Sequence, residues 1–319
     1  MNHTQQANQW LSRFEVAVTS NTNRVFANGR QQVEITLSIE PRKGQEITAE
    51  QLATLQLVVL DDDGIPRDLQ GDLQVSDQRD PRFVYHAASG AVPSALLQST
   101  PRTLRRRFYV SSTLAGGTLS TLYAGIWKDP ETHFETTRAP FQSSVIIESI
   151  AAPEPHISMF NLELEKTRET YHVEGAHDDE FEYQIGHFGC SDPRNSIVES
   201  RPHATPSGEA FYWRHNWEHV LISFTGTNDY SQHCYVAAYG VNETVEFDTA
   251  QAQRRLRNRP NHMSLCLYHR RFYRHHYSDR AEHASRWTVL DKHGNAYGIE
   301  FVATESGRSA TFRLTQAQA

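Results

Sequence analysis

The stretch Gln32–Glu40, with the sequence QVEITLSIE, decides the fold class. Its apolar residues, Val33, Ile35, Leu37 and Ile39, alternate with polar ones. Alternation with a period of two predicts a β-strand that has one buried face and one wet face. Burial of these side chains would contribute about 1.5 to 3 kcal/mol each before entropy is subtracted, which fixes the register against a one-residue slip. We therefore expect a central strand here.

Turn signals follow this strand. Thr48 and Gln51 have the spacing of a capping box, which predicts a short helical turn. Leu55–Leu60 then reads as a strand that ends in the tight turn Asp61–Gly64. Further strands are predicted in the N-terminal half at Phe83–His86, Arg106–Thr113, Thr118–Trp127 and Ser144–Ile150.

The fold class that this pattern predicts is all-β and mainly antiparallel. Short strands between turn clusters, with at most short helices, are typical of a sandwich or a barrel. We expect residues 1–151 to form an N-terminal β-sandwich domain. An immunoglobulin-like sandwich is the first interpretation, and it rests on architecture alone because the Cys, Trp, Cys spacing of true immunoglobulin domains is absent.

A chain of 319 residues exceeds what one hydrophobic core usually supports, which predicts two domains. Pro153 and Pro155 interrupt the strand pattern, so we place a linker at residues 152–156 and a C-terminal β domain, a sandwich or a barrel, at 157–319. Its expected strands are Ile157–Glu165, Glu180–Phe188, His219–Phe224, His233–Phe247, Leu265–Arg274, Trp287–Leu290, Tyr297–Ala303 and Ala310–Leu314. Asp291–Asn295 predicts a hairpin loop, and Gln251–Arg257 predicts a helix.

The composition of the chain makes several classes of protein less favoured. The net charge of -7 gives no reason to expect nucleic acid as a partner of the whole molecule. Three widely spaced cysteines, Cys190, Cys234 and Cys266, argue against a disulfide framework. Without a membrane-spanning apolar run or a signal-peptide pattern at the start, the cytoplasm is the expected location, and export without a cleaved signal stays open. The excess of arginine over lysine favours a bacterial source.

The sharpest motif is His215, Asn216, Trp217, Glu218, His219, which reads H-x-x-E-H. On a helix the two histidines would share a face and bind zinc, and Glu218 would act as a general base on metal-bound water. Aromatic and β-branched neighbours favour a strand instead, in which residues four apart lie about 13 Å apart and cannot share one ion. A zinc-dependent hydrolase with Glu218, His215 and His219 is therefore the alternative function.

A second metal site could combine His187 and Cys190 with His233 and Cys234. Four such ligands would suit structural zinc. Adjacent strand residues face opposite sides, however, so only one of His233 and Cys234 could readily face the ion. Buried cysteines and surface histidines are the simpler interpretation.

Charge and histidine are unevenly distributed. The segment Arg254–Arg286 has nine arginines and two acids among several aromatic residues, whereas Glu163–Glu182 has eight acids and two basic residues. The simpler account is that the two segments face each other within the domain or between protomers and partly cancel, or form a surface for a protein partner, and binding of single-stranded nucleic acid is the weaker alternative. Fourteen of the 17 histidines fall at or after His156, which is compatible with a pH-sensitive surface.

The Ser-, Thr- and Gly-rich pair of predicted strands in Arg106–Trp127 has an additional interpretation. Two such arms around Gly116 and Gly117 are what a pore-forming toxin could insert as a β-hairpin, although each arm is just short of the length that spans a bilayer. An ordinary sandwich hairpin explains the same residues. A secreted bacterial toxin or an effector accessory protein is a further alternative.

Common catalytic motifs are missing from the sequence. No G-x-S-x-G, G-x-x-x-x-G-K-[ST] or G-x-G-x-x-G pattern is present. We therefore expect a non-enzymatic protein without a cofactor that binds a protein partner through its C-terminal domain. Tyrosine, tryptophan and arginine most often anchor interfaces. The residues expected to do so here are Tyr268, Arg271, Phe272, Tyr273, Arg274, Trp213 and Trp217.

Overall fold

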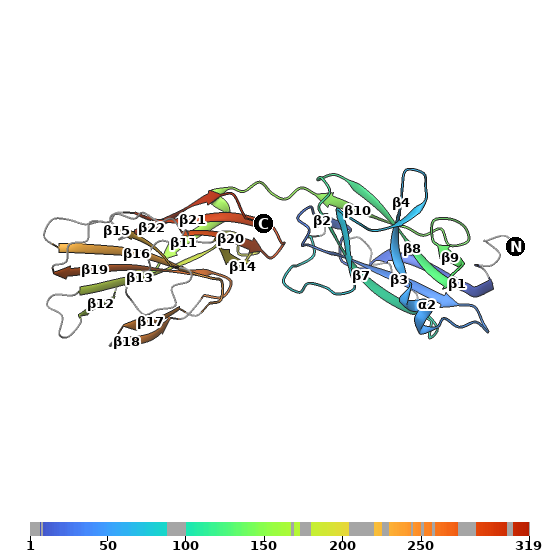
Figure 1. The fold of residues 1–319 in the computed structure, drawn as a ribbon, viewed down its shortest axis with the longest axis horizontal. Coiled ribbons are helices and arrows are strands. Elements are labelled where there is room, and N and C mark those ends of the chain that lie inside the picture. The colour runs from blue at the N-terminus through green and yellow to red at the C-terminus, as the bar shows by residue number, and fades with distance from the viewer. Residues whose placement is uncertain are drawn as a thin grey trace. The chain divides into compact units, whose positions relative to one another are not determined.

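The computed structural model describes residue 7 and residues 9–87, 100–166, 169–172, 180–203, 220–224, 230–243, 245–249, 252–256, 259–273, 285–304 and 309–318. Within these, it describes only the backbone of residues 169–172, 180–183, 220–224, 230–237, 245–249, 252–256, 268–273 and 303–304. The chain divides into two compact units: unit 1 is Met1–Pro153 with His293–Asn295, and unit 2 is Glu154–Lys292 with Ala296–Ala319. Both are almost entirely β (Figure 1).

Unit 1 contains two sheets. One has the strand order β1-β3-β7-β6, and the other has the order β2-β10-β8-β4-β5 with β9 paired to β8. All pairs are antiparallel except β2 with β10. The strands are β1 (Leu11–Val18), β2 (Arg24–Phe26), β3 (Val33–Pro41), β4 (Gln56–Leu60), β5 (Pro66–Asp68), β6 (Leu73–Ser76), β7 (Leu104–Ser112), β8 (Leu119–Asp129), β9 (Thr132–Glu135) and β10 (Val145–Ile150).

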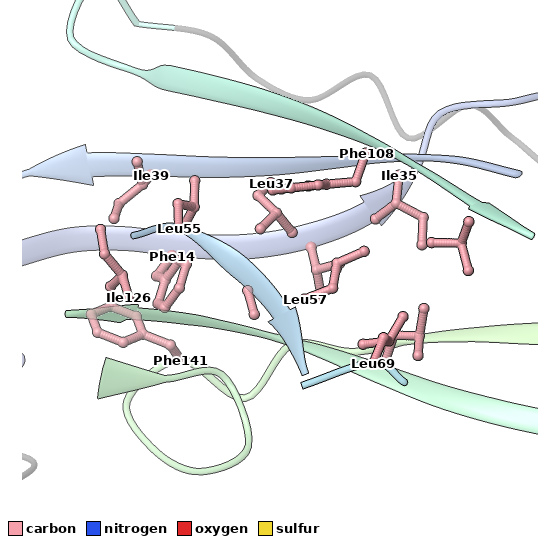
Figure 2. Close-up of a cluster of buried hydrophobic side chains, with 14 of the residues drawn as sticks. Phe14, Ile35, Leu37, Ile39, Leu55, Leu57, Leu69, Phe108, Ile126 and Phe141 are labelled. Carbon is pink, nitrogen blue, oxygen red and sulfur yellow. The ribbon is translucent and has the colours of Figure 1, made fainter. Parts of the chain in front are cut away.

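The core of unit 1 lies between its two sheets. Figure 2 shows Phe14, Ile35 and Leu37 from the first sheet opposite Leu57 and Ile126 from the second. A core formed by the inner faces of two packed sheets defines a sandwich. The predicted all-β, mainly antiparallel fold class is confirmed, while the immunoglobulin-like subtype stays a prediction.

The strand that decided the fold class is central, as predicted, because β3 lies between β1 and β7. Its four apolar side chains are fully buried. The prediction of a wet opposite face is wrong, because Thr36 and Ser38 are buried as well. The chain after β6 crosses this face, where the Tyr85 hydroxyl donates a hydrogen bond of 2.9 Å to Glu34 Oε2.

The short helix and the tight turn are confirmed. α2 (Ala49–Ala53) begins after Thr48, whose hydroxyl accepts a hydrogen bond from the Gln51 backbone N–H while the Gln51 side chain accepts one from the Thr48 N–H. Gly64 has a φ of 72°, which glycine adopts without strain, and closes the turn between β4 and β5. No helix among the described residues is long and apolar enough to cross a membrane.

Two predictions fail for local reasons. Phe83–His86 is not a strand, because its backbone is held by other groups: the Phe83 N–H donates to Asp80 O and Val84 O accepts from the Gln31 side chain. The sequence analysis also missed β1. Phe14, Val16 and Val18 alternate in this strand, but a β-bulge between Leu11 and Arg13 puts Leu11 out of phase with them and shortens the regular run.

The hairpin predicted within Arg106–Trp127 does not form. β7 pairs with β3 and β6, whereas β8 pairs with β4, β9 and β10, so the two arms belong to different sheets. The Gly117 N–H donates to Ser149 O, on β10. The Gly116–Gly117 turn therefore connects the two layers of the sandwich, and the interpretation as a membrane-inserting hairpin loses its structural basis.

Unit 2 also contains two larger sheets, with a separate two-stranded one. The orders are β11-β13-β19-β16-β15 with β12 paired to β13, β14-β20-β21-β22, and β17-β18. A short 3-10 helix, η1 (Ile157–Met159), precedes them. The strands are β11 (Phe160–Leu164), β12 (Glu169–His172), β13 (Glu180–Cys190), β14 (Ile197–Pro202), β15 (Val220–Phe224), β16 (Tyr230–Tyr239), β17 (Val245–Thr249), β18 (Ala252–Leu256), β19 (Met263–Tyr273), β20 (Ser285–Asp291), β21 (Ala296–Thr304) and β22 (Ser309–Thr315).

The core of unit 2 again lies between two sheets. Phe188 and Leu265 from the six-stranded sheet pack in one cluster with Trp287, Ile299 and Phe301 from the four-stranded sheet. Unit 2 is therefore a second sandwich and not a barrel. The predicted hairpin at Asp291–Asn295 is present between β20 and β21.

Two predicted elements of unit 2 are wrong. His233–Phe247 is not one strand, because a turn at Gly240–Glu243, with Asn242 at a φ of 61°, separates β16 from β17. Gln251–Arg257 is not a helix, because β18 pairs with β17 in antiparallel register. Alanine, glutamine and arginine favour helix locally, and hairpin pairing overrides that propensity.

Candidate functional site

The predicted recognition segment lies on β19, the central strand of the six-stranded sheet of unit 2. β19 pairs with β13 on one side and with β16 on the other (Figure 1). Because both neighbours are antiparallel to it, residues far apart in the sequence come directly opposite one another. The register of these three strands therefore decides which side chains share a surface.

The two faces of β19 are set by its described half. Met263, Leu265 and Leu267 are buried in the core between the sheets. Successive strand residues alternate between faces, so Ser264 and Cys266 belong to the opposite face. By the same alternation Tyr268 and Phe272 belong to that opposite face, and Arg271 and Tyr273 belong to the face of the core.

Three tyrosines stand in register on the opposite face. Tyr268 is paired with Tyr183 of β13 and with Tyr235 of β16. Two residues further along β19, Arg270 is paired with Phe181 and with His233. We name this surface the tyrosine face and define it by Tyr183, Tyr235, Tyr268, Phe181, Arg270 and Phe272.

The rows of His269 and Arg271, on the face of the core, hold charged and polar residues. Glu180 and Gln232 are the register partners of Arg271, and Glu182 and Cys234 are those of His269. Opposite charges at directly opposed positions stabilise a sheet. On the face that continues from the core, Tyr273 is paired with Tyr230, so aromatic residues occur on both faces beyond Leu267, and the row of three tyrosines lies on the opposite face.

Acidic and basic segments do meet within unit 2, as the simpler account expected. β13 carries the end of the acidic run and lies beside β19, which carries part of the basic run. Arg259 Nη1 lies 2.6 Å from Glu163 Oε2. The hydrogen bond from Arg259 holds the pKa of Glu163 below its ordinary value. Among the described side chains, this ion pair joins the two segments at one place.

The register separates the residues of the second predicted metal site. His187 is paired with Ser264, and Ser264 with Tyr239, so His187 is level with Tyr239. Cys234 lies five residues back along β16, about 17 Å away at the rise of a strand. One ion cannot bind residues at both places. Within the described residues no three His, Cys, Asp or Glu side chains gather in a metal-binding arrangement.

His187 is buried and bound to an acid. Its Nε2 lies 2.9 Å from Glu165 Oε1, and its buried Nδ1 has no hydrogen-bond partner. Glu165 follows β11 directly, and its N–H donates to Ile185 O, so the pair fixes the end of β11 on β13. We assign His187 a structural role at this joint.

Other titratable groups near the sheets are held in their neutral forms. Burial, with Arg286 nearby, lowers the pKa of His203. Burial raises the pKa of the Cys190 thiol to about 12, with smaller contributions from Asp291 and Asp192. Since the thiolate is the reactive form of cysteine, Cys190 is a poor nucleophile. The pH-sensitive surface stays a prediction.

Four of the seven predicted anchor residues are placed on β19, in two pairs. Tyr268 and Phe272 fall on the tyrosine face, and Arg271 and Tyr273 fall on the other face. A flat partner surface can therefore meet only one of these pairs. Arg274, Trp213 and Trp217 lie outside the described residues, as do His215, Glu218 and His219 of the H-x-x-E-H motif, so the zinc alternative stays a prediction.

Sequence reasoning missed the neighbours of Tyr268. Phe181, Tyr183 and Ile185 alternate along a strand that was predicted at nearly the right place. This alternation was a signal for an aromatic face. Tyr235 had no comparable signal, because its place beside Tyr268 depends on long-range register.

The sequence matches no protein-family model and no curated protein. Among solved structures, the chain was aligned with the crystal structure of the CupB6 tip adhesin from Pseudomonas aeruginosa, over 90% of this chain and 95% of that chain. The sequence identity is 9% and the TM-score is 0.14. A similarity at this TM-score supports no conclusion about function.

Proposed function

We propose that the chain is a non-enzymatic binding protein whose tyrosine face recognises a protein partner. The observation that carries the proposal is the row Tyr183, Tyr268 and Tyr235, in register across three neighbouring strands. Tyrosine and arginine are enriched at the residues that dominate binding energy in interfaces. Arg270 stands in the adjacent row, so both residue types share one face.

A sheet face suits this role because its backbone is already fixed. The three strands are joined by continuous antiparallel pairing, so the aromatic residues need no large ordering of the chain when a partner binds. On the opposite face, Glu180 is the register partner of Arg271.

The test uses the full chain and two matched tyrosines on one strand. Immobilised parent protein is used to capture a partner from an extract of the source cell. The affinity of this partner is then measured for the parent and for the variants Tyr268→Ala and Tyr273→Ala. Loss of an anchoring aromatic costs about 2 kcal/mol or more, roughly a thirtyfold loss of affinity. We expect this loss for Tyr268→Ala, and a change within about threefold for Tyr273→Ala on the other face.

Salt dependence separates anchoring from long-range charge. Affinity through buried aromatic anchors changes little between low and high salt, whereas a purely electrostatic surface weakens steeply. Arg270→Ala and Arg271→Ala provide a second matched pair on the two faces. If both tyrosine variants and both arginine variants bind as the parent does, with unchanged thermal stability, the tyrosine face is not the recognition site.

A further inference from the structure

Exposed apolar side chains of unit 1 concentrate on the outer face of its six-stranded sheet. On β4, β8 and β10, the residues that alternate with the core positions turn away from the core. Four large apolar side chains on this outer face are more than a third exposed: Leu60, Leu119, Trp127 and Ile146. Tyr123, half-buried, lies on β8 between Leu119 and Trp127. Apolar patches of this kind mark interaction sites more often than isolated exposed residues do.

Trp127 is 40% exposed and yet held firmly by its neighbours. Its ring lies against the His133 ring, with centroids 4.5 Å apart and planes tilted by 34°. His133 Nδ1 lies 3.0 Å from Glu135 Oε1, and Glu135 Oε2 accepts a hydrogen bond of 3.1 Å from the Thr137 hydroxyl. Trp127 is thus held by His133, which is in turn bound to Glu135.

The backbone around Trp127 also helps to fix the position of its side chain. A Cβ atom on Gly125 would lie 2.8 Å from His133 Nε2, so a larger residue there would displace the imidazole ring from its present place on the strand. A β-bulge between Trp127 and Asp129 interrupts the pairing of β8 with β9. Bulges re-aim side chains and are frequent beside functional sites. The backbone N–H of Trp127 donates a hydrogen bond of 3.0 Å to the Thr54 hydroxyl, which fixes the strand from the other side.

Two carboxylates and one ammonium group lie close to Trp127 in the sequence, and the ammonium group of Lys128 lies 5.9 Å from the ring centroid of Trp10, a residue of the core. Asp129 and Glu131 are exposed at the turn between β8 and β9, and the Glu131 N–H donates to Asp129 Oδ1 at 3.0 Å. The hydrogen bond from the Thr132 hydroxyl holds the pKa of Asp129 below its ordinary value, so this carboxylate is charged at neutral pH. An indole face is the best aromatic acceptor for a cation, and neighbouring carboxylates strengthen the attraction.

We propose that the outer face of this sheet is a second docking surface, for an extended, arginine-containing segment of a partner protein. A guanidinium group stacks on Trp127 beside Asp129 and Glu131, and apolar side chains of the same segment cover Tyr123 and Leu119. The distance along β8 from Leu119 to Trp127 is about 27 Å, which matches about eight residues of extended chain. This surface lies in unit 1 and is independent of the tyrosine face.

The probe is a synthetic octapeptide with one arginine and two leucines separated by glycines, and its control replaces arginine by uncharged, near-isosteric citrulline. Binding to the full chain and to each variant is measured by the fluorescence anisotropy of labelled peptide, and contact with Trp127 in the parent is followed by its indole N–H resonance, assigned with Trp127→Phe. We expect millimolar or tighter binding of the arginine peptide and about tenfold weaker binding of the citrulline peptide, within the range of a cation–π contact.

Variants locate the contact. Trp127→Ala should weaken binding of the arginine peptide about tenfold, whereas Trp127→Phe should retain part of it because phenylalanine is a poorer cation acceptor. Asp129→Asn combined with Glu131→Gln should weaken binding severalfold. The matched control, Asp62→Asn combined with Asp63→Asn, neutralises two exposed carboxylates in the β4–β5 turn and should have little effect.

Three outcomes would overturn the proposal. One is equal affinity for the arginine and citrulline peptides, which would indicate an apolar or uncharged occupant. Another is unchanged binding by Trp127→Ala with its circular dichroism intact. The third is a concentration-dependent shift of the Trp127 resonance without peptide, accompanied by a dimer in sedimentation, which would make a second copy of this chain the occupant.

Discussion

The central strands of the two units, β3 and β19, are each buried on both faces over part of their length, and neither sequence shows this by itself. In β3 the buried apolar residues alternate with polar ones, although Thr36 and Ser38 are buried too. In β19 Met263–Leu267 are buried on both faces and show no alternation of exposure. Alternation in sequence therefore identifies the face that packs on the second sheet, and it does not reveal whether the other face is covered.

The largest expected effect is that the unit that contains β3 and the unit that contains β19 fold independently of each other. We propose that residues 152–156 form an exposed linker, because residues 151–156 have no regular structure and are largely exposed. Limited proteolysis should cut there and release two fragments that each retain β-type circular dichroism. A single resistant core across the junction would show that β3 and β19 belong to one folding unit.

Core substitutions on the two strands should be about equally severe. Leu37→Ala in β3 and Leu265→Ala in β19 each remove a fully buried side chain and should cost about 2 to 5 kcal/mol of unfolding free energy. Ser38→Ala should cost almost nothing, because its buried hydroxyl has no hydrogen-bond partner to lose. Chemical denaturation measures all three, and a large loss for Ser38→Ala would show that the covered face of β3 depends on its polar groups.

A buried acid should make unit 2 more sensitive to low pH than unit 1. Glu300 of β21 has a side chain only 2% exposed and is bound by Arg313 at 2.8 Å, which lowers its pKa. A lowered folded-state pKa stabilises the fold above the ordinary pKa of the acid, and that stability is lost as the pH falls through the folded-state value. Glu300→Gln should cost about 2 kcal/mol at pH 7.

The matched control for this acid is Glu148 of unit 1, which pairs with Arg24 at 2.8 Å and has a side chain 30% exposed. Glu148→Gln should cost less than about 1 kcal/mol, because water screens a half-exposed pair. Thermal melts between pH 3 and pH 7 should show a flatter pH dependence for Glu300→Gln than for the parent. Equal behaviour of the two variants would contradict the role of burial.

The smallest expected effect is at the helix cap of unit 1. Thr48→Ala removes the side-chain half of the capping box and should cost about 1 kcal/mol. Thr48→Ser keeps a hydroxyl at the same place and should restore most of that stability. If alanine and serine give the same melting temperature, α2 contributes nothing measurable to unit 1.

Most of the strands could be predicted, and the candidate site could be predicted only in part. β3, β8, β10 and β20 were expected within a few residues of their bounds, because local alternation and turn residues specify them. β1 was missed although Phe14, Val16 and Val18 alternate, because its bulge leaves only a short run in phase, and β18 was taken for a helix because its composition favours one. On the candidate site, Tyr268 and Phe272 were expected, whereas Phe181, Tyr183 and Tyr235 were not.

By itself the sequence determined the all-β class, the positions of most strands and the hairpin between β20 and β21. Only the tertiary structure decided that β7 and β8 belong to different sheets and that Tyr183, Tyr235 and Tyr268 share one row. The physical reason is one of range. A strand's alternation reflects its own residues, whereas the register between distant strands is set by backbone hydrogen bonds and by packing of the whole core, which no local pattern encodes.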